Sequence, residues 1–264
     1  MRRRELMIAL GFATAWPIAA NAQSNCRDLR SQILLMQAEG IADKLARFIK
    51  EMQSQVGWTT QLPSTGGSIE QRRFDAVRLL RQALAITELS LLDVQGKEFY
   101  KVSRLALDVV GSGTDYSKEA KFTETVAKKI YYGPVHLRSE SEPYMTLGMA
   151  GTSTRPDVGA SVVELNLSLL WEIVQQSKVG ERGVAYIVNV EGRIIAHPDL
   201  LVRKSMRDLS SLAQVQEART SPARGWARSA RDMNDQKVVA AYARVAGTGW
   251  LVFVELPIGE WTSC

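Results

Sequence analysis

Apolar side chains recur every three or four positions along the stretch that follows residue 26. They stand at Leu29, Ile33, Met36, Ile41, Leu45, Phe48, Met52 and Val56. This spacing places them on one face of an α-helix, and we predict one long helix over residues 23–58. Gly40 lies within it and weakens it, since glycine costs about 1 kcal/mol in a helix interior. The sequence leaves three roles open for such a helix. It can pack along two modules, form a seam for self-association, or cover a single sheet.

The loop-forming stretch TTQLPSTGGS separates this helix from a second one, predicted at residues 69–84. Ser68 is its expected N-cap, and Gln71 stands at the capping-box position. From Ile86 the period changes to that of strands. LSLLDVQGKEFYKVSR (89–104) is typical of a strand, a turn at Asp93–Gly96 and a second strand, because Asp tolerates turn conformations and Gly supplies positive φ.

The same frame returns 96 residues later (189 minus 93) in AYIVNVEGRIIAHPDL, residues 185–200. Asn189 matches Asp93, Gly192 matches Gly96 and Arg193 matches Lys97. Two such turns in the same setting indicate a duplicated unit.

Each copy is followed by a predicted helix and further strands. After the first copy come a helix at 117–130 and strands within 131–138, 142–152 and 158–167; after the second come a helix at 209–221 and a hairpin within 237–257. We therefore predict an α+β fold, in which the long N-terminal helix is followed by two modules, each a five-stranded antiparallel sheet flanked by helices. The first module spans residues 59–167 and the second 184–264, joined by a connecting helix at 168–183.

The first 22 residues have the pattern of an export signal. A basic start precedes an apolar run from Leu6 to Trp16 and the small-x-small sequence Ala20-Asn21-Ala22. Residues 3–7 also fit the twin-arginine export pattern loosely. The alternative is an uncleaved anchor, although the run has about half of the ~20 residues that cross a bilayer and Pro17 interrupts it. We expect a periplasmic protein, anchored in the inner membrane if the signal is not cleaved.

Composition and charge argue against nucleic acid as a partner. The chain of 264 residues is 45% hydrophobic and 23% charged, with a net charge of +5. Residues 2–5 supply +2 of this, and the remaining +3 (5 minus 2) is too weak and dispersed for a nucleic-acid interface. The two cysteines, Cys26 and Cys264, can form a disulfide in an oxidising compartment, but nothing in the sequence brings them together.

His197 and Asp199 invite a catalytic interpretation that the rest of the chain does not support. Pro198 separates them, there is no Gly-x-Ser-x-Gly nucleophile elbow, and His136 is the only other histidine. No HxH, HExxH or CxxC pairing indicates a metal site. We expect no enzyme, metal or cofactor, and predict that His197 ends a strand at which Pro198 stops the ladder.

Several stretches, in their order, resemble the double Cache family, the extracytoplasmic ligand-binding regions of bacterial histidine kinases, nucleotide cyclases and chemoreceptors. They are DYSKEAKFTETVAKKIYYGPV, SEPYMTLGMAG, VGASVVELNLSLLWEIV, GERGVAYIVNVEGRIIAHPD and GWLVFVELP, within residues 23–260. The resemblance implies two PAS-like modules on a long helix, a small ligand in the first, membrane-distal module, and a homodimer across the long helices. It also implies a membrane-bound kinase or cyclase as the partner for output.

The chain departs from this family in two respects. Family receptors continue into a second membrane helix, whereas this sequence stops at GEWTSC, so a free-standing periplasmic sensor or solute-binding protein and a truncated receptor are both open. Amino-acid-binding members carry an Arg and a Trp-Tyr pair where this chain has Lys118, Lys121 and Phe122. An amino-acid ligand therefore cannot be carried over from the family.

Aromatic and cationic residues gather in the first module. We predict that its ligand is contacted by Tyr116, Lys118, Lys121, Phe122, Tyr131, Tyr132, Arg138 and Tyr144. Aromatic walls with a few cations suit a small anionic or zwitterionic organic molecule, and Glu140 and Glu142 can balance the charge. Nearby, Asp157 is predicted to form a turn, Asn166 to cap the connecting helix and Trp171 to lie in the core.

The sequence thus predicts an extracytoplasmic small-molecule sensing domain of a bacterial signal-transduction system. A free-standing periplasmic solute-binding protein is the alternative within the same class. An exported hydrolase is the competitor from another class, and it lacks a nucleophile–base pair.

Overall fold

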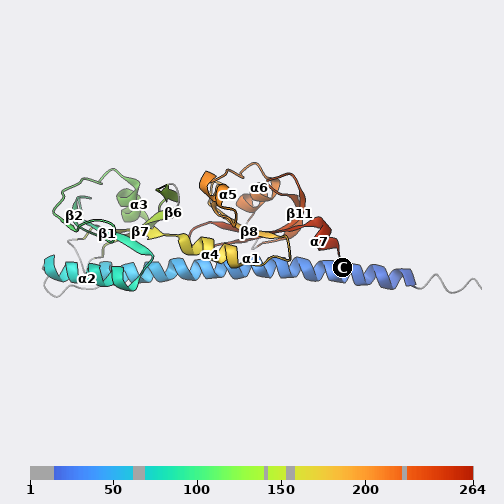
Figure 1. Cartoon of the computed structure of the whole chain (residues 1–264). Helices are drawn as coiled ribbons and strands as arrows, with labels where there is room; N and C mark the ends of the chain where they lie inside the picture. The colour runs from blue at the N-terminus through green and yellow to red at the C-terminus, as the bar shows by residue number, and fades with distance from the viewer. Residues whose placement is uncertain (1–14, 62–68, 140–141, 153–157, 222–224, 264) are drawn as a thin grey trace, which may run out of the picture.

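Two modules lie side by side along one long helix (Figure 1). The computed structural model describes residues 15–61, 69–139, 142–152, 158–221 and 225–263. The long helix, α1 (Ala15–Gln61), runs without a break through Gly40, where an added Cβ would meet no atom within 4 Å. The predicted long helix is confirmed, and it extends beyond the expected 23–58 at both ends. The start of the predicted export signal lies outside the described residues, so its cleavage stays a prediction.

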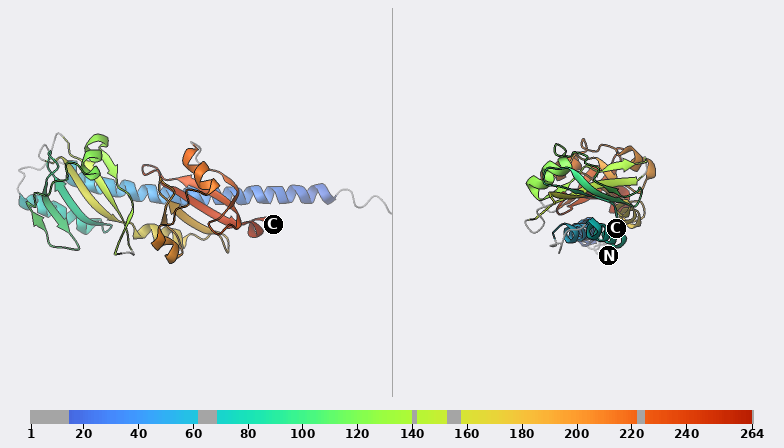
Figure 2. Two further views of the ribbon diagram at one scale, coloured as in Figure 1. Left: turned by 90° about the horizontal axis from the view of Figure 1, so that it is seen from above. Right: turned by 90° about the vertical axis from the view of Figure 1, so that its left-hand side faces the viewer.

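The first module places a sheet over the C-terminal half of α1. Its helices are α2 (Ile69–Gln82), which lies beside α1 (Figures 1 and 2), and α3 (Ala120–Lys128). Its strands are β1 (Ile86–Leu92), β2 (Glu98–Ser103), β3 (Val109–Val110), β4 (Ile130–Tyr132), β5 (His136–Arg138), β6 (Glu142–Ala150) and β7 (Ala160–Asn166). They form one sheet in the order β3-β2-β1-β7-β6-β4, with β5 paired to β6. The expected N-cap Ser68 and turn residue Asp157 lie outside the described residues.

The second module repeats this arrangement over the N-terminal half of α1. Helix α4 (Ser168–Gln176) connects the modules. The remaining elements are β8 (Val184–Val188), β9 (Ile194–Ala196), α5 (Leu200–Ser205), α6 (Ala213–Thr220), β10 (Ala227–Arg231), β11 (Lys237–Arg244), β12 (Leu251–Pro257) and α7 (Ile258–Thr262). The sheet order is β10-β11-β12-β8-β9, so each strand has a counterpart in the first sheet. All the described strand pairs of both sheets are antiparallel.

The predicted α+β class, with two antiparallel sheets flanked by helices, is confirmed. The first sheet has seven strands where five were expected, because β3 and β5 are short additions at its edges. The predicted connecting helix at 168–183 ends at Gln176. Besides these short edge strands, three further elements were not predicted: β10, α5 and α7. The sequence of β10, ARSAR, has no alternation of apolar and polar residues, and α5 and α7 bury none of their residues.

The two predicted turns share one hydrogen-bonding pattern, which explains the repeated frame. Asp93 Oδ1 accepts from the backbone N–H groups of residues 95 and 97, both at 2.9 Å. Asn189 Oδ1 accepts from residues 191 and 193 at 3.1 and 2.8 Å. Gly96 and Gly192 have φ of 83° and 91°, a region that glycine adopts at little cost.

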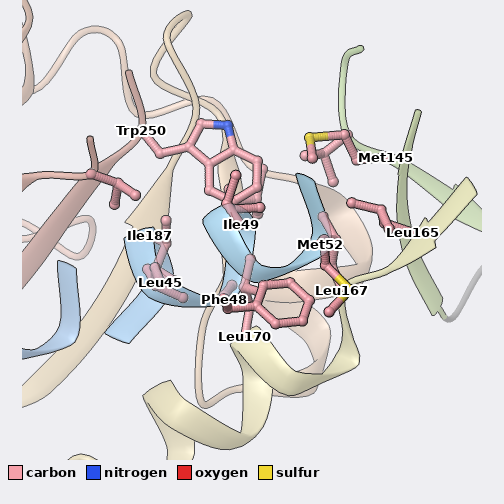
Figure 3. Close-up of a cluster of buried hydrophobic side chains, with 14 of the residues drawn as sticks. Leu45, Phe48, Ile49, Met52, Met145, Leu165, Leu167, Leu170, Ile187 and Trp250 are labelled. Carbon is pink, nitrogen blue, oxygen red and sulfur yellow. The ribbon is translucent and has the colours of Figure 1, made fainter. Parts of the chain in front are cut away.

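The core is continuous between the modules because α1 contributes to both. One cluster of buried side chains includes Leu45, Ile49 and Met52 from α1 together with residues of both sheets. In Figure 3 the α1 side chains lie between Met145 and Leu165 of the first module and Ile187 and Trp250 of the second; Leu167 and Leu170, around the start of α4, lie nearby. The face of each sheet turned away from α1 is called its outer face below.

The C-terminal helix α7 closes the second module onto the start of α1. The Arg30 guanidinium donates to the backbone oxygens of Glu260, Trp261 and Ser263, the last two at 3.1 Å. The Glu260 carboxylate in turn accepts from backbone N–H groups of the loop between α4 and β8. Cys26, four residues before Arg30, is disulfide-bonded. The only other cysteine of the sequence, Cys264, lies outside the described residues.

Within the described residues no helix combines the length and the apolar character that crossing a bilayer requires.

Candidate functional site

The outer face of the first sheet carries a row of polar and charged side chains. Strand alternation sends Leu89, Leu91 and Leu165 into the core beside α1 and therefore turns Glu88, Ser90 and Glu164 outward. Helix α3 covers part of this face. It approaches the sheet closely at Gly148, where a Cβ would lie 1.9 Å from Thr125 Oγ1. A glycine at this position is what lets α3 form one wall above the face.

An ion pair lies on the outer face of β1 and β2. Lys101 Nζ is 2.7 Å from Glu88 Oε1, with 28% and 16% of the two side chains exposed. Burial lowers the pKa of Lys101, but the hydrogen bond and charge of Glu88 outweigh it and leave this pKa raised. Ser90 donates to Glu98 Oε2 at 2.7 Å within the same group. Two carboxylates and one ammonium thus share a partly shielded surface.

This group of polar side chains on β1 and β2 is bordered, on the side of α3, by Tyr116, Lys121 and Phe122. Lys121 Nζ lies 3.4 Å from the centre of the Tyr116 ring and 3.4 Å from Glu119 Oε2. Burial raises the pKa of the Tyr116 hydroxyl, and the Glu98 carboxylate raises it further, so the hydroxyl stays a donor at neutral pH. Phe122 and Tyr116 pack on the outer-face cluster of Leu92, Ala160 and Val162. Three of the predicted ligand residues are therefore brought together.

Glu164 lies at the centre of the outer face, on β7. Its Oε1 accepts from Thr146 at 2.6 Å, and His136 Nε2 lies 3.9 Å from its Oε2. Glu164 and Glu88 face each other across the β1–β7 pair. Glu88 pairs with Lys101, while the Glu164 carboxylate is held by the Thr146 hydroxyl.

Arg138 and Tyr144 form a second pair, on β5 and β6. The Arg138 guanidinium stacks 5.1 Å from the centre of the Tyr144 ring. Tyr144 is fully buried, and its hydroxyl donates to Glu142 and accepts from Asn166 Nδ2 at 3.2 Å. Asn166 Oδ1 accepts from the N–H of Ser168, the first residue of α4, in agreement with the capping role predicted for it.

Lys118 and Tyr132 are predicted ligand residues that do not lie on the outer face with this group. Lys118 is exposed in the turn before α3. Tyr131 and Tyr132 are neighbours on β4, and neighbouring strand residues point to opposite faces. Tyr131 lies on the outer side near Glu124 of α3, whereas Tyr132 borders a hollow with α1 and Gly247 of the second module. The structure therefore places these two tyrosines on opposite faces of the sheet.

Sequence reasoning missed five polar residues of this face, four of them charged: Glu88, Glu98, Lys101, Glu164 and the neutral Thr146. A signal was present, because the polar residues at 88 and 90 alternate with the leucines at 89 and 91. This alternation predicts a polar outer face for β1. The charged residues of β1, β2 and β7 lie outside the aromatic-rich stretch 116–144.

The second module has a carboxylate at the equivalent position. Ala160 pairs with the residue before the Asp93 turn, and Leu251 pairs with the residue before the Asn189 turn. Four residues further along each strand stand Glu164 and Glu255. Glu255 is buried and accepts from the Tyr186 hydroxyl at 2.7 Å and from Gln214 Nε2 at 3.2 Å. Its burial raises its pKa to about 7.

His197 has the structural role predicted for it. It is buried directly after β9, and its Nδ1 accepts the backbone N–H of Asp199 at 2.9 Å. Burial lowers its pKa, which favours the neutral ring. Asp199 caps α5 by accepting from the N–H of Leu201 at 2.7 Å. Both side chains are thus engaged with backbone groups.

Trp171 is partly buried and ties α4 to β9. Its Nε1 donates to Ile195 O at 3.1 Å, in line with the core role predicted for it. Across the described ranges, no three side chains of His, Cys, Asp or Glu gather as metal ligands do.

Comparison with known proteins places this architecture. The model of a family described as Cache domain matches residues 19–263. A search of curated protein sequences found no match.

Solved structures with the same architecture have low sequence identity to this chain. One is the ligand-binding domain of the amino acid chemoreceptor PctC of Pseudomonas aeruginosa PAO1 in complex with GABA, with a TM-score of 0.65, 15% identity and coverage of 86% of this chain and 99% of that one. A second is the ligand-binding domain of the Campylobacter jejuni chemoreceptor Tlp3 with L-norvaline, with a TM-score of 0.60, 13% identity and coverage of 97% and 98%. A third is the extracellular domain of the putative histidine kinase mmHK1S-Z2, with a TM-score of 0.61, 13% identity and coverage of 94% and 99%. At such identities these likenesses establish the fold alone.

Proposed function

We propose that this chain, which belongs to the Cache domain family, is an extracytoplasmic sensor of a small zwitterionic organic molecule. The ligand binds on the outer face of the first module, between the sheet and α3. The observation that carries the proposal is the meeting of both signs of charge there: the ammonium groups of Lys101 and Lys121, and the carboxylates of Glu88 and Glu164.

The chemistry of recognition follows from this arrangement. A carboxylate of the ligand binds Lys121, whose pair with Glu119 is partly exposed and is therefore worth no more than about 1 kcal/mol. An ammonium group of the ligand binds Glu164, whose second oxygen faces His136 at 3.9 Å. Tyr116 offers an aromatic surface to the body of the ligand. A purely anionic ligand would offer no ammonium group to the Glu164 carboxylate, whose partners are the Thr146 hydroxyl and His136, which favours the zwitterion.

The structural neighbours support the same class of ligand. Two of them were solved with GABA and L-norvaline, which are zwitterions. This chain has Lys121 and Glu119 close together at the start of α3, so the ligand's carboxylate meets an ammonium rather than a guanidinium group here. A change in the preferred ligand is therefore expected.

A thermal-shift screen tests the proposal. The purified protein is heated with amino acids, other amino-carboxylic acids, and simple organic acids and amines as controls. A zwitterion at 100 times its Kd is expected to stabilise the protein by about 2.7 kcal/mol. No stabilisation by any zwitterion, or stabilisation by amines and acids alike, would contradict the proposal.

Output belongs to the same proposal. Binding shifts the populations of two arrangements of the first sheet on α1, which requires the ligand to prefer one of them. A membrane-bound kinase or cyclase then reads the position of α1.

The disulfide at Cys26 suits an oxidising, extracytoplasmic compartment such as the periplasm. A free-standing solute-binding protein is the second candidate. Neither candidate requires catalysis, and His197 is engaged with backbone.

We also propose a homodimer across α1. Its N-terminal half exposes an apolar stripe of Leu29, Ile33 and Met36, with 57%, 45% and 67% of each residue accessible. Their spacing of four and three residues places them on one face, and a second copy of α1 would cover it.

Met36→Lys places a charge within this stripe and is expected to shift the protein from dimer to monomer. Sedimentation or light scattering gives the mass, and Leu84→Lys is the matched control because Leu84 is 76% exposed after α2. A wild-type monomer at about 100 μM, or equal dimerisation of both variants, would contradict the dimer.

A further inference from the structure

The second module has a pocket of its own on its outer face, between the start of α6 and strand β10. Its volume is about 690 Å³, within the range of small-molecule sites. Apolar side chains form much of its wall: Leu212, Trp226 and Met233, which also pack on the buried cluster of Tyr186, Tyr242 and Phe253. A pocket with such a wall holds the apolar body of a ligand.

The pocket rests on a buried polar side chain. Gln214 is 3% exposed, and its Nε2 donates to Arg231 O at 2.6 Å and to Glu255 Oε1 at 3.2 Å. Glu255 in turn accepts from Tyr186. These bonds fix the position of Gln214, so the floor of the pocket is formed before any ligand arrives.

The Arg228 guanidinium is an available donor at the Trp226 end of the pocket. The Trp226 ring packs edge-on against Tyr242, 5.2 Å between centres, and its Nε1 is buried without a hydrogen-bond partner in the described part of the chain. The Arg228 guanidinium lies 5.4 Å from the Trp226 ring centre. Its Nη1 binds Glu217 at 2.6 Å, with 61% and 42% of the two side chains exposed. Such an exposed pair is weak, and guanidinium has further donors.

The acidic side chains around the pocket are already engaged. Glu217 pairs with Arg228, and Asp235 pairs with Arg231 at 3.0 Å. Asp232 Oδ1 accepts from the backbone N–H groups of residues 234 and 236. The pocket therefore favours an acceptor group of a ligand over an ammonium group.

We propose that the second module binds a small carboxylic acid with an aromatic or branched aliphatic body. The carboxylate binds Arg228 beside the Trp226 ring, and the body lies on Leu212, Trp226 and Met233. This site is separate from the outer face of the first module, and it does not rest on the function proposed for that face. A chain with both sites responds to two chemically different small molecules.

The indole N–H resonance of Trp226 reports on this site. The chain has six tryptophans, and Trp226→Phe assigns the resonance by removing it from a ¹H–¹⁵N spectrum of the whole protein. Phenylacetate, benzoate and isovalerate are titrated to about 10 mM, which detects even a millimolar Kd. At least one acid is expected to move the resonance to saturation, while phenethylamine, benzylamine and isopentylamine do not.

Two exposed variants and one distant variant complete the test. Arg228→Met is expected to weaken binding of the acid at least about tenfold, while Glu217→Gln, which removes the competing carboxylate, does not weaken it. Lys121→Met in the first module leaves it unchanged, so failure here is distinguishable from failure of the first site. The proposal is overturned if the resonance does not move with any acid, moves equally with the amines, or saturates unchanged in Arg228→Met.

Discussion

Glu255 shows how burial sets the chemistry of a single side chain. The residue is 5% exposed, and its carboxyl accepts from Tyr186 and Gln214. Burial raises its pKa from 4.5 to about 7, against the lowering effect of those two hydrogen bonds. The folded protein thus holds a proton that the unfolded chain releases above its ordinary pKa.

This difference makes stability depend on pH in a defined direction. Between about pH 4.5 and 7 the folded state binds more protons than the unfolded state, so the contribution of Glu255 is full below this window and is lost as pH rises through about 7. The total is on the order of 3 kcal/mol. In the Glu255→Gln variant this loss of folding stability with rising pH is absent, because the amide does not ionise.

Urea unfolding of both proteins at pH 5 and pH 8 measures this effect. Relative to wild type, Glu255→Gln is expected to gain stability at the higher pH. His197, whose lowered pKa acts with the opposite sign, is present in both proteins and cancels in the difference. A stability difference that is the same at both pH values would refute the assignment.

Single residues also mark the limit of the sequence argument. The tyrosines at 131 and 132 were grouped because they are adjacent and aromatic, whereas strand geometry sends them to opposite faces. The bond between Gln214 and Glu255 joins residues 41 apart, and no periodic pattern indicates it. The roles of His197 and Asn166 were predictable because each has its hydrogen-bond partner two residues away.

The two hairpin turns are the elements that the sequence predicted best. Each depends on one side-chain oxygen, of Asp93 or Asn189, that accepts two backbone N–H groups. Local chemistry of this kind is visible in four consecutive residues. The hydrogen bonds between Arg30 and α7 could not be predicted from the sequence, since Arg30 and its acceptors are more than 200 residues apart in the chain.

Removing either oxygen tests the equivalence of the turns. Asp93→Ala and Asn189→Ala each remove the acceptor of two turn N–H groups and are expected to destabilise the protein by about 0.5 to 1.5 kcal/mol. Thermal or urea unfolding gives both values. The control Val94→Ala changes an exposed residue of the same turn (55% accessible) and is expected to be nearly neutral. A large loss for one turn and none for the other would contradict a shared role.

The whole molecule is organised around α1, which completes the core of both modules. Leu45 is fully buried in the cluster that also includes residues of the two sheets. The modules are therefore expected to unfold together. The sequence predicted the length of α1. It did not predict which α1 residues contact each sheet, because this register depends on packing.

Leu45→Ala tests the shared core. It is expected to cost about 2 to 5 kcal/mol and to lower a single calorimetric transition, as the two modules lose the same support. Lys44→Ala, at an exposed position of α1 outside the stripe of Leu29, Ile33 and Met36, is the control for helix propensity. Two separate transitions, with only one lowered in Leu45→Ala, would show that the modules are independent.

Lys121 and Glu164 are the two residues through which the outer face of the first module is proposed to bind a small zwitterion. Calorimetric titration with the zwitterion that stabilises the protein most is the direct test. Lys121→Met and Glu164→Gln are each expected to raise its Kd at least about tenfold, since each removes a hydrogen bond to a charged group. Lys128→Met, which removes an exposed lysine at the other end of α3, is expected to leave the Kd unchanged. A Kd that is the same in all three variants would contradict the account.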